Sequence, residues 1–435
     1  MNRKKILIIG AGLAGLATAY FLKKRRVEVC IFEKERVCGG LCRSIKKSGF
    51  TFDFSGHFLH FRNPQILFLI KDILKDNLVK HKRNAYVYSF NRYIPHPFQI
   101  NFYHLPEKIA RECQLGLIET HNNRERLSNN GSFLSWIYNK LGRGIAKYFM
   151  LPYNRKFWKV CLDGLTCEWT ERFIVTPSIE DITGSLFGRG SNNLGYNAFF
   201  WYPHKGGIEE LIKAFASNQK NIYLNGEVQE IDLNKKCIKL KNTSKERFDT
   251  LISTIPLPEL GKIIKGLDKS ILANFKKLRW LSIYNINFGI DNIIQRKRHW
   301  IYFPQKDISF FRVGFFHNFS PYLAPSGKGS LYVEVSYSKD RPIQRSSIVS
   351  RIKKDLKKIG IIKKESQILC ENVNDIKYGY PLYDRNYKGI REKIINFLLK
   401  NNIYSCGRYG SWQYLSMEDV ILEGENIANT VYNEL

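Results

Sequence analysis

The first residues that could do chemistry are glycines at fixed spacing near the start of the chain. An apolar run at 5–9 leads into a GxGxxG turn, helical apolar spacing continues at 16–26, and a second apolar run at 27–32 ends at Glu33. The acid stands 18 residues beyond the last glycine of the turn. A strand, glycine turn, helix, strand and acid in this order predict a dinucleotide-binding βαβ unit.

Each glycine of this turn is expected to have a distinct structural role. Gly10 permits the tight turn, Gly12 lets a pyrophosphate approach the N–H groups of the helix start, and Gly15 permits close packing of helix on strand. Glu33 would accept hydrogen bonds from ribose hydroxyls, and its charge disfavours a 2′-phosphate. The expected cofactor contacts of this unit are Gly10, Gly12, Leu13, Ala14, Gly15, Glu33 and Lys34.

A second glycine element follows the βαβ unit. Residues 37–44 read VCGGLCRS, and residues 50–57 alternate like a short strand that runs into Gly56 and His57. Together the two elements resemble the extended FAD motif of the amine oxidase, protoporphyrinogen oxidase and UDP-galactopyranose mutase superfamily. The resemblance implies FAD, with the isoalloxazine ring near Gly56, and NAD-binding proteins have no reason to carry this element. The residues implied along the pyrophosphate are Gly39, Gly40, Leu41 and Arg43.

Further segments place the resemblance nearest the UDP-galactopyranose mutase-like branch. They are the glycine–histidine segment 56–60, the strand-turn 92–101, the stretch 153–158 and the block 407–417, which reads GRYGSWQYLSM. The chain departs from the mutases at Ser416, where they carry aspartate before the methionine. It also departs at 202–211, which reads more like the glycine-pair turn of the oxidases and desaturases. These departures leave the substrate open.

The resemblance implies roles for single side chains. The catalytic candidates are His57, Arg312, Arg408 and Tyr414; the substrate candidates are Arg172, Tyr196, Arg312 and Tyr414; the remaining flavin candidates are Gly56, His57, Val228, Gly407, Arg408 and Met417. Arginine suits a diphosphate because its planar guanidinium gives bidentate, charge-assisted hydrogen bonds. For Arg172 and Arg312 a structural salt bridge is an open alternative. For His57 the alternatives are packing against the flavin and proton transfer.

The C-terminal block has a physical logic apart from the resemblance. Gly407 is expected to end a buried strand at 403–406, and Ser416 is a plausible N-cap with Asp419 three residues on. The helix N-terminus at Met417 would then face the flavin and stabilise the anion that a reduced flavin carries. The alternative is that Ser416 caps an ordinary amphipathic helix.

The composition indicates a globular protein of several parts. The chain has 435 residues, of which 44% are hydrophobic and 14% aromatic, so more than one core is expected. We predict an α/β fold with a discontinuous Rossmann-type FAD-binding domain, a helical insertion and a mixed-sheet substrate domain. The expected boundaries are 1–60, 205–265 and 390–435 for the FAD-binding domain, 61–204 for the mainly helical region and 266–389 for the mixed-sheet region.

The net charge of +30 has several possible explanations. The excess lies in short lysine clusters along the chain, which compositional drift of an AT-rich genome would explain. Alternatives are a basic funnel for a small anionic substrate such as a nucleotide sugar, or peripheral contact with an anionic membrane surface. Motifs of nucleic-acid recognition are missing, so no nucleic-acid partner is expected. The oligomeric state stays open.

The cysteines and the N-terminus bear on location. Nine cysteines occur without a CxxC pair, which argues against a disulfide framework, and no cluster has metal-ligand spacing. The apolar run at 5–9 is too short for a signal peptide, and no stretch approaches the ~20 apolar residues that span a bilayer. A cytoplasmic protein is expected, without a metal.

Two mechanisms fit these features. In the mutase-like mechanism, N5 of the reduced flavin acts as the nucleophile at the anomeric carbon of a nucleotide sugar, while arginines hold the diphosphate. In the oxidoreductase mechanism, the flavin takes hydride from a C–N or C–C bond. A non-catalytic FAD-binding protein is a third alternative.

Overall fold

The computed structural model describes residues 4–122, 131–186, 194–195 and 198–435. Its first layer is a five-stranded parallel sheet with the order β19-β13-β1-β2-β9. Distant parts of the chain supply these strands, so the Rossmann-type fold is discontinuous, as predicted. The strands are β1 (Ile6–Ile9), β2 (Val29–Phe32), β9 (Ile222–Tyr223), β13 (Thr250–Ser253) and β19 (Ile403–Ser405).

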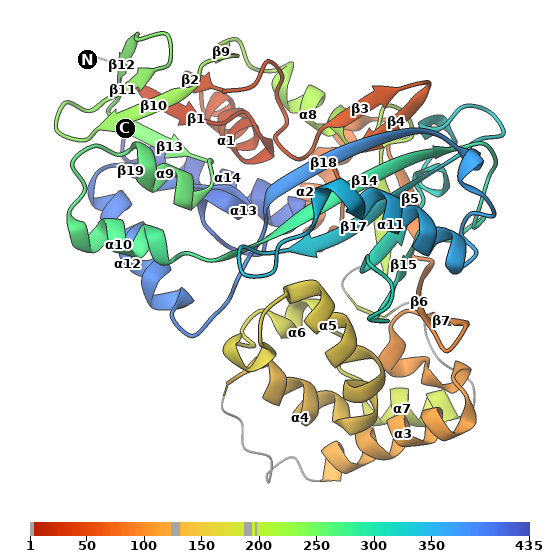
Figure 1. Cartoon of the computed structure of the whole chain (residues 1–435). Helices are drawn as coiled ribbons and strands as arrows, with labels where there is room; N and C mark the ends of the chain where they lie inside the picture. The colour runs from red at the N-terminus through yellow and green to blue at the C-terminus, as the bar shows by residue number, and fades with distance from the viewer. Residues whose placement is uncertain (1–3, 123–130, 187–193, 196–197) are drawn as a thin grey trace.

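Two helices from opposite ends of the sequence pack together beside this sheet. Helix α1 (Leu13–Lys24) lies against α14 (Met417–Asn433), and a Cβ on Gly424 would stand 3.0 Å from Oγ1 of Thr18. The close approach brings the start and the end of the chain into one unit (Figure 1). Shorter elements complete this part, namely α8 (Glu209–Ala216), α9 (Leu257–Ile263), α10 (Lys269–Lys277), α12 (Tyr387–Lys400), α13 (Gly407–Gly410), and the antiparallel strands β10 (Val228–Asp232), β11 (Cys237–Leu240) and β12 (Lys245–Arg247).

A seven-stranded mixed sheet forms the second large layer. Its order is β18-β14-β17-β16-β15-β6-β7, and only the β15–β6 pair is parallel. Helix α11 (Arg345–Lys358) covers one face with Ile352 and Leu356. The strands are β18 (Ile368–Pro381), β14 (Trp280–Ile290), β17 (Gly329–Tyr337), β16 (Arg312–Gly314), β15 (Trp300–Tyr302), β6 (Ala85–Ser89) and β7 (Arg92–Pro95).

The third part is a group of helices that lies below the sheets in Figure 1. Helices α3 and α4 meet without side chains between them at Gly116 and Gly142, where a Cβ on Gly142 would lie 2.2 Å from the Gly116 carbonyl oxygen. The helices are α3 (Glu107–Asn122), α4 (Phe133–Ile145), α5 (Leu151–Trp158), α6 (Thr170–Phe173) and α7 (Ile179–Leu186).

The region expected to be mainly helical also contains strands. Besides β6 and β7, it holds β5 (Val79–Lys82), which pairs with β8 (Phe199–Tyr202). Helix α2 (Pro64–Leu74) precedes them, and the hairpin of β3 (Ser44–Lys47) and β4 (Phe50–Asp53) leads into the segment at Gly56. Among the described residues, no helix has the length and apolar character that crossing a membrane requires.

Candidate functional site

The glycine turn is closely packed at Gly10 and Gly15. Gly10 has a φ of +100°, and a Cβ on it would lie 2.3 Å from Oγ1 of Thr254. A Cβ on Gly15 would lie 2.0 Å from the Gly10 carbonyl oxygen, so α1 sits directly on the turn. At Gly15 a side chain would require the backbone to move, and at Gly10 the positive φ disfavours any residue with a Cβ.

Gly12 differs from its neighbours because the space beside it is open. A Cβ there would meet only the Cα of Gly40, at 4.0 Å, and Gly12 has an ordinary φ of −75°. Gly39 closes this end of the turn, since its N–H donates to the Ala11 carbonyl at 2.8 Å. Leu13 and Ala14 begin α1, whose first turn carries no acidic residue. Open space beside Gly12, at a helix N-terminus whose first turn carries no acid, fits a pyrophosphate.

Glu33 stands at the end of β2 with its carboxylate fixed. One oxygen accepts the Ala11 N–H at 2.7 Å and the other accepts the Glu35 N–H at 3.0 Å, and the side chain is buried. Each oxygen keeps a lone pair for a ribose hydroxyl. Lys34 faces solvent beside Glu35, and Val228 lies buried at the start of β10.

Arg43 braces the second glycine element. Its Nε donates to the Gly40 carbonyl at 2.8 Å, and its guanidinium lies 4.8 Å from the ring centroid of Phe54. Leu41 lines the cavity described next. The structure therefore brings the residues of both glycine elements to one end of the parallel sheet.

A cavity of about 270 Å³ lies where the three parts of the molecule meet. The loop at Gly56 and His57, the start of α14 at Met417, and α5 all contribute to its wall. Fourteen of the 33 residues that line the cavity are phenylalanine, tyrosine or tryptophan, and these form its aromatic wall: Phe54, Phe58, Phe149, Tyr153, Phe157, Trp158, Trp169, Phe173, Trp300, Tyr302, Phe311, Tyr380, Tyr409 and Tyr414. Its cationic side chains are Arg312 and Arg408.

Arg312 is paired with a carboxylate. Its Nη2 donates to Oε1 of Glu334 at 2.9 Å, and its Nε donates to Oε2 of the same side chain. Glu334 comes from β17 and is 2% exposed. The pair is formally neutral, so the salt bridge that the sequence left open for Arg312 exists, while the side chain also lines the cavity.

Arg408 has no carboxylate partner in the part of the chain that the structure describes. Its Nε and Nη2 donate to the Leu415 carbonyl at 2.8 and 2.5 Å. Its guanidinium lies 5.1 Å from the ring centroid of Tyr414 and 5.6 Å from that of Tyr380. Gly407, which precedes it, has a φ of +82°, and a Cβ there would lie 2.5 Å from the Cβ of Ala14. Arg408 is therefore a cation in an aromatic wall whose charge is not compensated.

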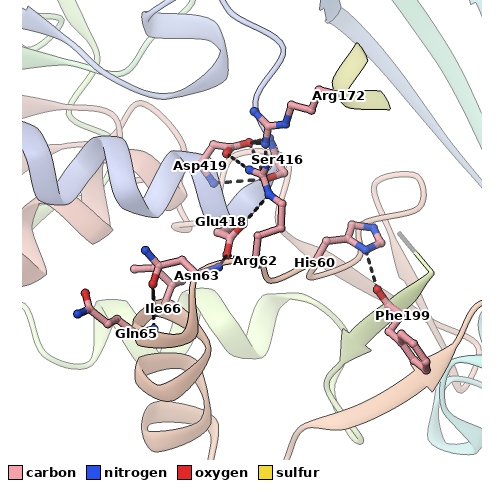
Figure 2. Close-up of polar contacts among 10 residues, drawn as sticks. All are labelled: His60, Arg62, Asn63, Gln65, Ile66, Arg172, Phe199, Ser416, Glu418 and Asp419. Carbon is pink, nitrogen blue, oxygen red and sulfur yellow. Dashed lines mark hydrogen bonds and ion pairs between the residues drawn. The ribbon is translucent and has the colours of Figure 1, made fainter. Parts of the chain in front are cut away.

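Arg172 lies at the edge of the same region and is held by the start of α14 (Figure 2). Its Nη2 donates to Oδ2 of Asp419 and lies 3.5 Å from Oγ of Ser416. Arg62 pairs with the other oxygen of Asp419 at 2.9 Å. The ring of Tyr414 lies tilted against that of Phe173, the neighbour of Arg172 in the sequence, with the ring centroids 4.1 Å apart. Arg172 thus forms the structural salt bridge that was one of its two alternatives.

The N-cap expected at Ser416 is present. Ser416 Oγ accepts the Asp419 N–H at 3.3 Å, and the Ser416 N–H donates to the Asp419 carboxylate at 2.6 Å. Glu418 and Asp419 place two carboxylates in the first turn of α14. Both carboxylates are paired with arginines, Glu418 with Arg62 and Asp419 with Arg62 and Arg172, so their charges are balanced at this helix terminus.

His57 lies in the cavity wall as a neutral imidazole. Burial, together with the guanidinium groups of Arg408 and Arg312, lowers the pKa of His57 to about 3. A Cβ on the preceding Gly56 would lie 2.4 Å from the hydroxyl oxygen of Tyr332, so this glycine is required by packing in the apoprotein. A histidine with this pKa is a poor proton donor at neutral pH, which favours the packing alternative.

The sequence-derived candidates are incomplete in two ways. Tyr196 lies outside the described residues. Ser55 and Glu334, which line the cavity, are missing from the candidates. Glu334 carries a detectable signal, because it is the only charged residue in the otherwise strand-like run GSLYVEVSY at 329–337. A lone acid on a buried strand needs a cationic partner.

Part of this chain is also similar to a known sequence. A 4,4′-diapophytoene desaturase (4,4′-diaponeurosporene-forming) from Staphylococcus aureus is 33% identical over 155 residues. The match covers 35% of this chain and 29% of the desaturase, so the similarity is limited to one segment of each protein.

Solved structures resemble the whole fold. Reduced UDP-galactopyranose mutase has a TM-score of 0.94 and 28% identity, with 99% of this chain and 96% of that chain covered. A putative protoporphyrinogen oxidase from Exiguobacterium has a TM-score of 0.79 at 17% identity, with both chains fully covered. At that identity the likeness shows the fold alone.

The family is shown by the match over nearly the full length. Residues 13–432 match the flavin-containing amine oxidoreductases. The open space beside Gly12, the fixed carboxylate of Glu33 and the cavity at Gly56 fit the cofactor of that family. This protein is a FAD-dependent enzyme and belongs to the flavin-containing amine oxidoreductase family.

Proposed function

We propose that this enzyme acts on a nucleotide sugar, in the manner of a UDP-galactopyranose mutase. The observation that carries the proposal is the uncompensated guanidinium of Arg408 in the cavity wall. A cation enclosed by aromatic rings without a carboxylate favours binding of an anion such as a diphosphate. The likeness to the mutase over 99% of the chain supports the same choice.

The residues of the chain have distinct tasks in this proposal. Arg408 and the free N–H groups of Arg312 bind the diphosphate. The aromatic wall stacks against a base or sugar face and excludes water. Gly12 and Glu33 hold the pyrophosphate and ribose of FAD, which supplies a nucleophilic ring nitrogen when it is bound and reduced.

Turnover by the reduced enzyme tests the proposal. Dithionite-reduced protein is incubated with UDP-galactopyranose, and conversion to the furanose form is followed by chromatography. We expect conversion by the wild type and a fall in kcat/KM of about a hundredfold in Arg408→Met, since a charge-assisted contact contributes about 3 kcal/mol. Arg408→Lys keeps the charge and is expected to lie between them. No conversion by well-folded, FAD-loaded wild type would exclude the mutase function.

A second candidate function is oxidation of a C–N or C–C bond. It is supported by the match to the amine oxidoreductase family and by the 33% identity to a desaturase segment. In that case the aromatic wall would bind an apolar substrate. Peroxide formation with polyamines or porphyrinogens under oxygen would favour this candidate, and peroxide release by the mutase-inactive protein would decide for it.

A further inference from the structure

Ser55 has an unusual backbone conformation for a buried serine. Its φ is +74°, in the left-handed region, and it directly precedes Gly56 in the cavity wall. A residue with a Cβ pays about 1 kcal/mol for this conformation, whereas glycine adopts it freely. A serine at this point therefore needs a reason that lies in its hydroxyl group.

The hydrogen bonds of Ser55 supply that reason. Its hydroxyl donates to Oε1 of Glu334, and its N–H donates to Oδ1 of Asn285 at 3.2 Å. Asn285 lies on β14, is fully buried and is fixed in turn by Asn374, whose Nδ2 donates to it at 2.8 Å. Ser55 is thus anchored to the sheet on one side and to the carboxylate on the other.

The carboxylate that Ser55 contacts is the partner of Arg312. Oε1 of Glu334 accepts both the Ser55 hydroxyl and Nη2 of Arg312, while Oε2 accepts Nε. An arginine has five N–H donors, so this fork leaves three of them for the cavity. The direction of those three depends on the plane of the Glu334 carboxylate, which the Ser55 hydroxyl helps to fix.

We propose that Ser55 is a positioning residue, whose hydroxyl orients Arg312 towards the anionic ligand by holding Glu334. The proposal rests on the proposed function for the nature of the ligand. On this proposal the strained backbone at Ser55 is kept for ligand binding, because glycine at this position would allow the same fold without strain.

Two substitutions separate the hydroxyl from the backbone. Ser55→Gly removes the hydroxyl and relieves the strain, so the protein is expected to fold with its melting temperature within a few degrees of the wild type. Ser55→Ala removes the hydroxyl and keeps the strain. Both are expected to raise the Kd for UDP about tenfold, measured by the change in flavin absorption, since one hydrogen bond to a charged group is lost.

A matched control comes from the β3–β4 turn. Ser48 also has a left-handed backbone, with a φ of +51°, but it is exposed and outside the cavity wall. Ser48→Gly is expected to leave the Kd for UDP unchanged. The control shows whether relief of strain at a serine is by itself enough to change binding.

The background variant Arg312→Lys distinguishes positioning from a general structural effect. If Ser55 acts through Arg312, Ser55→Gly has no further effect on the Kd for UDP once Arg312 is lysine. An unchanged Kd in Ser55→Gly, or the same tenfold loss in the Arg312→Lys background, would overturn the proposal.

Failure of the proposed function is recognised separately. If the wild type does not convert UDP-galactopyranose, the wild type and the same variants are compared by their Kd for inorganic pyrophosphate, whose binding needs the arginines and no sugar. Ser55→Gly and Ser55→Ala are again expected to raise the Kd about tenfold. An unchanged Kd in Ser55→Gly, or the same tenfold loss in the Arg312→Lys background, would again overturn the proposal. Wild type that binds neither UDP nor pyrophosphate overturns both proposals.

Discussion

Substitution of Gly12 by alanine is expected to weaken FAD binding without destabilising the fold. A Cβ on Gly12 meets nothing closer than the Cα of Gly40, at 4.0 Å, and the backbone there needs no positive φ. As N-cap of α1, alanine costs about 0.5–1 kcal/mol relative to glycine, and the stiffer unfolded chain returns about the same amount. The melting temperature of the apoprotein is therefore expected to stay within about 3 °C of the wild type.

Binding of FAD is expected to respond differently. The methyl group would occupy the space in which a pyrophosphate approaches the helix N-terminus, so at least one charge-assisted hydrogen bond to the phosphate is lost. Such a bond contributes about 1.5–3 kcal/mol, which corresponds to a ten- to hundredfold higher Kd for FAD.

The assay is titration of apoprotein with FAD, followed by quenching of flavin fluorescence. Gly389→Ala is the control, because Gly389 lies in α12 with nothing within 4 Å of its added Cβ. It should leave the Kd unchanged. Wild-type affinity of Gly12→Ala for FAD would show that the dinucleotide does not lie at this turn.

Three further predictions follow from the same contacts. Gly15→Ala places a Cβ 2.0 Å from the Gly10 carbonyl oxygen, so the free energy of unfolding of the apoprotein should fall by about 3 kcal/mol, measured by urea unfolding; a wild-type value would contradict the packing. Ser416→Ala removes the cap of α14 and should lower the free energy of unfolding by about 1 kcal/mol in the same urea assay, with an unchanged value counting against the cap. Burial lowers the pKa of both His57 and His299 to about 3, with Arg408 and Arg312 adding to the effect at His57 and His81 adding to it at His299. The folded protein therefore binds fewer protons than the unfolded chain below pH 6.5. Each histidine should then lower the free energy of unfolding by about 2 kcal/mol at pH 5 relative to pH 7. Burial raises the pKa of Asp53 to about 6, so this carboxyl has a smaller effect of the opposite sign. Urea unfolding at the two pH values measures the sum, and equal or greater stability at pH 5 would contradict it.

The parallel sheet was predictable because its signals are local. The turn at Gly10, the strand at 403–405 and the cap at Ser416 each depend on residues within about ten positions. Apolar runs in the second half likewise predict β14 and β17, whose observed bounds are Trp280–Ile290 and Gly329–Tyr337.

The strands inside the helical region were less predictable because their partners are remote. Strand β5 pairs with residues 199–202, and β6 pairs with β15 at 300–302. A short run such as VKHK at 79–82 has little β-propensity of its own, so its conformation is decided by the strand beside it.

The site, too, combines features that local sequence predicts with features that depend on remote residues. The arginines are visible in the sequence, but the charge that each presents depends on a distant carboxylate. Arg172 meets Asp419 across 247 positions, Arg312 meets Glu334 across 22, and Arg408 meets none in the described part of the chain. Spacing alone could not single out Arg408 as the uncompensated cation, nor place Ser55 beside Glu334.

A crystal structure of the FAD-loaded protein soaked with UDP tests the central proposal most directly. The account predicts the diphosphate in the aromatic cavity, with its oxygens within about 3 Å of the Arg408 guanidinium and the free N–H groups of Arg312. UDP bound elsewhere, or a diphosphate in the cavity that avoids Arg408, would contradict it.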